Sequence, residues 1–136
     1  MHAAQVRSMT VAGRVLLTLI FLVAAGGKLL DFNGTAQHLA TKGVPLASLA
    51  LTVAIALEVV GALLVLVGFH ARLGALLLIV FLVPTTLVMH NFWALQGNAA
   101  IAEMLQFLKN MAILGGLLLV SAYGAGAWSL DAKGRA

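Results

Sequence analysis

The sequence predicts an all-α integral membrane protein, a bundle of four transmembrane helices. Of its 136 residues, 62% are apolar and only 9% are charged. A water-soluble domain carries about 25% charged residues, so this chain has too few polar side chains to cover a globular surface in water. In addition, four apolar blocks divide the chain, and each is long enough for the roughly 20 residues that a helix needs to cross the hydrocarbon core.

The four blocks are continuous apolar runs, whereas the strands of a membrane barrel alternate in hydropathy over about ten residues. The predicted spans are residues 11–30, 46–67, 72–89 and 104–123 of a single membrane domain, 1–136. Pro45 stands where the second helix starts, a position that suits its fixed φ. The linkers are residues 31–44, 68–71 and 90–103. The short middle linker predicts an antiparallel hairpin.

Four spans place both termini on the same side of the membrane. The positive charges on that side would be Arg7, Arg14, Arg72, Lys133 and Arg135, against Lys28, Lys42 and Lys109 on the other. The positive-inside rule then predicts that both termini are cytoplasmic. An alternative is that the first block is a cleaved signal peptide ending near Ala24-Ala25-Gly26. The apolar run continues to Leu30, which favours a retained span.

Composition also excludes several kinds of site. The chain has no cysteine, which removes disulfides, thiolate metal sites and cysteine nucleophiles. Its net charge is +4, but the Lys and Arg residues are scattered and form no basic stripe for nucleic acid. No glycine-rich phosphate loop is present. A redox role would therefore need a bound cofactor or a partner.

Glu58 is the most unusual residue because it lies about twelve residues into the second span, near the middle of the bilayer. An ionisable side chain there costs at least about 2.5 kcal/mol unless it has a partner or a polar cavity. Ala54, Gly61 and Ala62 share its helical face, so Glu58 should point into the bundle. It is either a protonated, neutral carboxyl that forms a hydrogen bond to another helix, or an acid that handles protons or binds a ligand.

A second polar group lies where three spans end or begin, at similar depth. Its members are Lys28, Asp31, His90, Asn91, Glu103, Gln106, Lys109 and Asn110. The spacing of Glu103, Gln106 and Asn110 forms one stripe, which we expect to face the bundle interior. The alternative is interfacial: Lys28 and Lys109 would extend to headgroups beside the aromatic pair Phe92-Trp93.

His90 has no second ligand at a useful spacing, so we expect a hydrogen bond from it and neither a metal site nor a haem held by two histidines. Glycines inside the spans indicate close helix packing. These are Gly26, Gly27, Gly61, Gly74, Gly115 and Gly116.

With these residues in view, the chain resembles the DoxX family of small four-helix membrane proteins over about residues 14–131. The matching features are Gly27-Lys28-Leu29, Gly43-Val44-Pro45, Glu58 with Gly61, Gly68 before Arg72, His90-Asn91-Phe92, Glu103, Phe107 to Asn110, Gly124, Gly126 and Ser129-Leu130-Asp131. The order and spacing of these features together carry the resemblance.

The resemblance implies an accessory subunit or anchor of a redox or respiratory complex in the bacterial inner membrane, with quinone as the suggested cofactor. The family takes its name from a small subunit associated with a terminal quinol oxidase. The implied partners are lipid and oxidoreductase subunits. Chain size favours a homo-oligomer or hetero-complex, because four short helices enclose little interior. Two alternatives remain: a small proton-coupled transporter or channel that uses Glu58, and a purely structural assembly factor. We do not expect an enzyme that acts alone.

Overall fold

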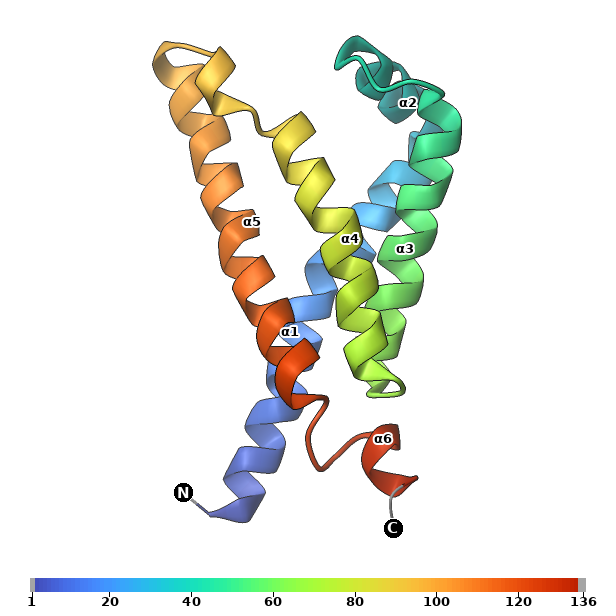
Figure 1. Cartoon of the computed structure of the whole chain (residues 1–136), viewed down its shortest axis with the longest axis vertical. Helices are drawn as coiled ribbons and strands as arrows, with labels where there is room; N and C mark the ends of the chain where they lie inside the picture. Colours follow the sequence, from blue (N-terminus) through green and yellow to red (C-terminus); the bar gives the residue numbers. More distant parts are fainter. Residues whose placement is uncertain (1, 135–136) are drawn as a thin grey trace.

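The computed structural model describes residues 2–134, which form a helical bundle (Figure 1). The elements are α1 (Ala3–Leu30), α2 (Phe32–Thr41), α3 (Ala47–Val67), α4 (Ala71–Met89), the 3-10 helix η1 (Phe92–Ala94), α5 (Gly97–Tyr123) and α6 (Leu130–Lys133). In this part of the chain, α1, α3, α4 and α5 are long and apolar enough to cross a membrane, which confirms the predicted fold class. The start of α1 and helix α6 lie at the same end of the bundle.

Two membrane helices begin earlier than the apolar blocks suggested, since α1 starts at Ala3 and α5 at Gly97. Hydropathy marks the part of a helix that lies in lipid, whereas backbone hydrogen bonding continues into the polar flanks. The linker expected at residues 31–44 also contains a helix, α2. Its first turn is capped by the Asp31 carboxylate, which accepts a hydrogen bond from the backbone N–H of Gly34 at 3.1 Å.

Helix α2 is held by a small apolar cluster. Ala36 is buried with Leu51 and Ile55 of α3, and Phe32 and Leu39 pack against the same cluster. The positions 32, 36 and 39 recur with helical spacing, so α2 presents one apolar face to α3. Asp31, Asn33 and Gly34 in this linker indicate turns, so the short apolar periodicity was not recognised as a helix.

Helices α3 and α4 form the expected hairpin and touch through two glycines. A Cβ on Gly74 would lie 2.8 Å from the carbonyl oxygen of Gly61, and a Cβ on Gly61 would lie 2.9 Å from that of Gly74. These positions confirm the predicted close packing. The prediction is wrong for Gly26, Gly27 and Gly115, where a Cβ would meet nothing within 4 Å. No other described helix covers the backbone there.

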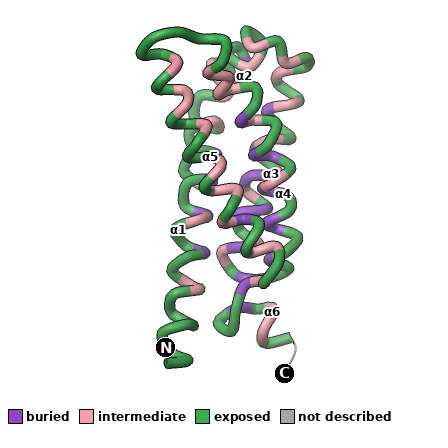
Figure 2. Tube along the Cα trace, turned by 60° about the vertical axis from the view of Figure 1, so that its left-hand side comes forward, coloured by how far each residue is buried: buried purple, intermediate pink, exposed green. Residues whose placement is uncertain are grey.

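The main hydrophobic core fills the half of the bundle nearer to the termini. It is built around Phe21, Val65, Leu78 and Leu117, each from a different membrane helix. Buried positions concentrate on α3 and α4, as Figure 2 shows, and α5 is the least buried of the four spans. Towards the other end α3 and α4 diverge, and α5 leans away from the bundle (Figure 1). That half is therefore more open.

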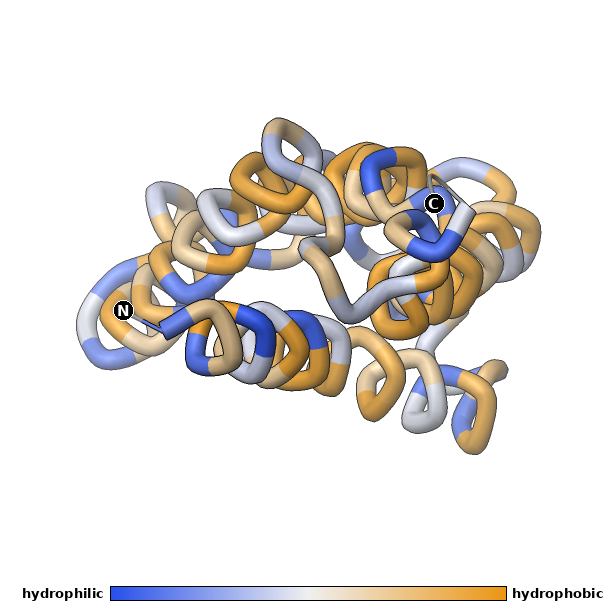
Figure 3. The backbone as a smooth tube through the Cα atoms, turned by 90° about the horizontal axis from the view of Figure 1, so that it is seen from below, coloured by the Kyte–Doolittle hydropathy of each residue, from blue (hydrophilic) through white to orange (hydrophobic). Residues whose placement is uncertain are grey.

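The segment after α5 closes the end of the bundle that carries the termini. Figure 3 looks onto this end, where hydrophilic positions gather at the start of α1 and around α6. The Asp131 carboxylate accepts hydrogen bonds from the backbone N–H groups of His70 at 2.7 Å and Ala71 at 3.0 Å, and so caps α4. The predicted charge cluster here included Arg135, which lies outside the described residues. Which side of the membrane this end faces stays a prediction.

Gly74→Ala should destabilise the bundle because the new Cβ would collide with the backbone of Gly61. Overpacking of this kind typically costs about 1–3 kcal/mol in the free energy of unfolding. The measurement is equilibrium denaturation of the purified protein in detergent micelles. Gly115→Ala is the matched control and should not destabilise the bundle, because its Cβ would meet nothing within 4 Å and alanine favours the helix. Equal stability of both variants would contradict the close α3–α4 contact.

Candidate functional site

A polar cavity of about 160 Å³ lies inside the more open half of the bundle. Side chains from all four membrane helices and from the residue after α4 line it. Its polar lining residues are Lys28, Glu58, Thr85, His90, Lys109 and Asn110. Five of these six were predicted as site residues from the sequence, so the fold brings most of the predicted set together around one space.

The central interaction of the cavity is an ion pair between Lys28 of α1 and Glu58 of α3. The Lys28 Nζ donates to both carboxylate oxygens of Glu58, at 2.8 and 3.1 Å. Glu58 is only 1% exposed, so its charge has little contact with the surroundings of the bundle. The Lys28 ammonium also lies 5.3 Å from the centroid of the Phe81 ring, within cation–π range.

This pair corrects the interfacial interpretation of Lys28. The side chain extends into the bundle, because a buried carboxylate attracts an ammonium strongly where water is excluded. Glu58 points inward, as its small neighbours predicted. The sequence alone did not identify its partner, which is 30 positions away along the chain.

A second pair lies at the edge of the cavity, towards the end opposite to the termini. His90 follows α4, and its Nδ1 lies 2.7 Å from Oε2 of Glu103 on α5. His90 therefore makes the hydrogen bond expected of it. Both side chains are partly exposed, so this pair connects the cavity with the surface.

Asn110 is buried on α5 and donates from Nδ2 to Oγ1 of Thr86 on α4 at 2.9 Å. The Thr86 hydroxyl in turn donates to the carbonyl oxygen of Leu82 at 2.7 Å. Sequence reasoning missed Thr86. The signal was available, because Pro84-Thr85-Thr86 interrupts an apolar span and Pro84 lacks the N–H that would complete the helix.

The predicted stripe on α5 faces the interior only in part. Gln106 is exposed and accepts a hydrogen bond from the Lys109 ammonium one turn away. The expectation that Gln106 faces inward is wrong, because the residue is exposed. Helix α5 leans away from the bundle towards its start (Figure 1). Asn91 also does not line the cavity. Its side-chain oxygen accepts from the Lys42 Nζ at 3.4 Å.

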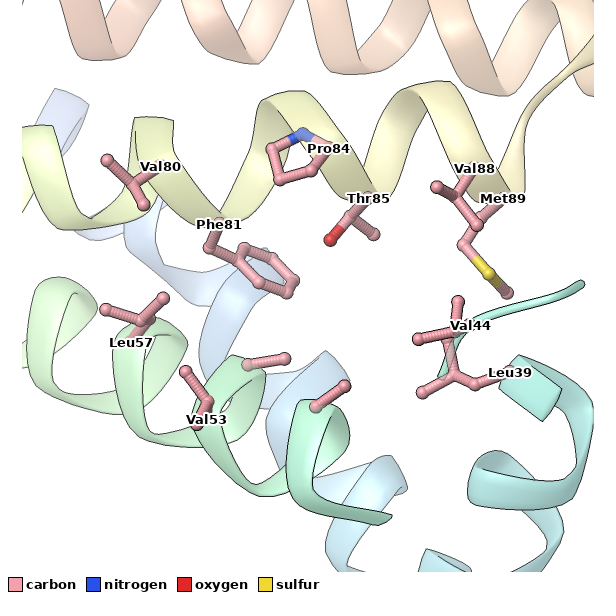
Figure 4. A pocket seen from close by; sticks show the side chains of 12 residues that line it. Leu39, Val44, Val53, Leu57, Val80, Phe81, Pro84, Thr85, Val88 and Met89 are labelled. Atoms are coloured by element: carbon pink, nitrogen blue, oxygen red, sulfur yellow. The ribbon is translucent and has the colours of Figure 1, made fainter. Parts of the chain in front are cut away.

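An apolar pocket of about 380 Å³ adjoins the polar cavity (Figure 4). It lies between α3 and α4, below the end of α2, and shares the residues Phe81 and Thr85 with the cavity. In Figure 4 the Phe81 ring extends from α4 towards α3, and Met89 extends towards Val44. Together the two spaces offer a polar compartment next to an apolar one.

No group of three or more His, Cys, Asp or Glu residues within the described part of the chain could hold a metal ion. Lys28, Glu58, His90, Lys109 and Asn110 line the cavity, so hydrogen bonds and charge are available there to a ligand.

Comparisons with known proteins point to one family. The family model of DoxX matches residues 9–91. Inner membrane protein YphA of Escherichia coli (strain K12) is 37% identical over 120 residues, which cover 88% of this chain and 86% of that protein. Inner membrane protein YqjF of the same organism is 36% identical over 118 residues, covering 87% and 85%. No solved structure matches the chain.

Lys28→Met should strongly destabilise the protein because it leaves the Glu58 carboxylate buried without its ionic partner. Breaking a buried pair from one side typically costs about 3–5 kcal/mol, whereas replacing both charges by apolar groups is often close to neutral. The double variant Lys28→Met/Glu58→Leu should therefore recover most of the lost free energy of unfolding. Denaturation in detergent micelles measures the free energy of unfolding of the wild type, the two single variants and the double variant. If the double variant loses the sum of the two single losses, the two side chains do not form a pair.

Proposed function

Because the chain belongs to the DoxX family, we propose that it acts as an inner-membrane accessory subunit of a redox complex and binds the head of a quinone in its polar cavity. The relatives named inner membrane proteins and the four apolar spans support the location. The observation that carries the proposal is the buried Lys28–Glu58 pair, which opens onto a cavity instead of being sealed in the core. A purely structural ion pair needs no such space.

The residues around the cavity fit the chemistry of a quinone head, which is a flat ring with carbonyl oxygens that accept hydrogen bonds. Lys28 and Asn110 are donors on different helices, and Lys109 adds a third. The cavity is smaller than the about 300–1,000 Å³ typical of whole ligands, so it suits a head ring. The adjoining apolar pocket suits the start of a hydrocarbon tail.

When bound, a quinone supplies two-electron, two-proton redox chemistry. In this proposal the electrons belong to a partner oxidoreductase, since the chain itself has no cysteine to hold an iron–sulfur cluster or to form a redox-active disulfide. The role of this chain is to bind and orient the ring and to exchange protons through ionisable side chains. His90 lines the cavity and contacts the partly exposed Glu103, so this pair offers a proton route to the surface. With cytoplasmic termini, that surface is the periplasmic one.

The packed core favours binding over transport. Below the cavity, Phe21, Leu78 and Leu117 belong to one buried cluster that fills the half of the bundle nearer to the termini. The Phe21 and Phe81 rings meet edge to face, with centroids 6.2 Å apart, at the floor of the cavity. A transporter or channel for a solute would need this core to open.

The test is the quinone content of the protein after mild extraction from its own membrane. We expect about one quinone per protein, together with a co-purifying oxidoreductase detected by native mass spectrometry. Glu58→Gln and Asn110→Leu should each lower the quinone content about tenfold, because the first removes the charge that holds the Lys28 ammonium in the cavity and the second removes a hydrogen-bond donor.

Gly74→Ala is the control, since it is expected to lower stability without changing the cavity lining. A wild-type protein without quinone, or full quinone content in both cavity variants, would refute the proposal. Uptake of a solute into liposomes that Glu58→Gln abolishes would instead support transport.

A further inference from the structure

A groove of about 870 Å³ runs along the outside of the bundle between α1 and α5. These two helices barely touch, although they lie next to one another in the bundle. Small residues deepen the groove from both sides, namely Gly13 on α1 and Gly116 on α5. Leu17, Ile113 and Val120 make most of its length apolar. The groove is large enough for a hydrocarbon chain and is open towards the lipid.

One end of the groove carries a buried cation. Arg14 lines the groove and is 5% exposed. Its Nη2 donates to the carbonyl oxygen of Trp128 at 2.5 Å, whereas its Nε and Nη1 have no hydrogen-bond partner within the described chain. These two nitrogens are enclosed by the protein, and Nη1 packs against Gly68 in the turn between α3 and α4. Arg14 therefore acts on a ligand in the groove through its charge and not through a direct hydrogen bond.

The surroundings of Arg14 are positive overall. Arg72 flanks the same end, because its Nε lies 3.6 Å from the position that a Cβ on Gly124 would take, and Gly124 lines the groove. Arg7 and Lys133 are at this end as well. Asp131 attracts the Arg14 guanidinium, but its carboxylate already caps α4. The cationic end thus has an excess of positive charge.

The depth of this end matches the headgroup region. Tyr123 and Trp128 are exposed near Arg14, and exposed aromatic side chains of this kind mark the membrane interface. The apolar length of the groove would then lie at the depth of the acyl chains. Basic pockets between membrane helices at this level are typical binding sites for acidic lipid headgroups.

We propose that the groove binds one acidic phospholipid, with its phosphate beside Arg14 and an acyl chain between α1 and α5. A second copy of the chain fits less well. Asp31, Glu58 and Glu103 lie in the middle or at the opposite end of the bundle. A parallel copy would therefore bring only Asp131 to this end, and that carboxylate caps α4 within its own copy. The groove shares Lys109 and Ile113 with the polar cavity, but Arg14 and Gly116 line only the groove, so this proposal can be tested separately from the quinone proposal.

The test uses purified protein exchanged into mixed micelles with equal amounts of phosphatidylglycerol and phosphatidylethanolamine. Native mass spectrometry then counts the lipids that stay bound. We expect one retained phosphatidylglycerol, with a preference of about tenfold over phosphatidylethanolamine. Gly116→Leu should abolish retention, because a Cβ there already lies 3.2 Å from Leu17 and a larger side chain fills the groove.

Gly115→Leu is the matched control, because a Cβ at this position would meet nothing within 4 Å and Gly115 does not line the groove. Equal retention of the two lipids by the wild type would overturn the proposal without relying on any variant. A dimer that Gly116→Leu dissociates would overturn it in favour of a second copy. Quinone content should not differ between Gly116→Leu and the wild type, which separates this proposal from the function proposed above.

Discussion

The architecture depends on neutralising one carboxylate in the middle of a membrane-spanning helix. Glu58 is buried in α3, and Lys28 of α1 supplies the compensating charge at 2.8 Å. Because a lone charge in low dielectric is costly, α1 has to pass close to α3 at this level. Helix α1 accordingly packs on α3 and scarcely on α5. The pair borders the polar cavity, and α1 and α5 stay apart along the groove.

The two halves of the bundle are held together by different interactions. Near the termini, Gly61 and Gly74 let α3 and α4 meet backbone to backbone, and an apolar core fills the remaining space. In the other half the helices diverge, and polar side chains hold them through specific contacts such as Asn110 to Thr86. Dispersion and close packing dominate the first half, whereas directional bonds dominate the second.

The sequence predicted what depends on composition and local spacing. Apolar block length predicted four spans, and the small residues around Glu58 predicted its inward direction. Pairing across the bundle needs the relative rotation of helices, so neither Lys28 as the partner of Glu58 nor Thr86 as the partner of Asn110 could be identified. Gln106 was misplaced because helical spacing shows which residues share a face but not whether another helix covers that face.

The cap that Asp131 places on α4 can form only late in translation. Asp131 comes 60 positions after Ala71, whose backbone N–H it accepts. During translation, the α3–α4 hairpin leaves the ribosome long before this residue does. Until Asp131 has been made, water at the membrane surface can satisfy the N–H groups at the start of α4. The native cap on α4 therefore forms only after the last membrane helix has been synthesised.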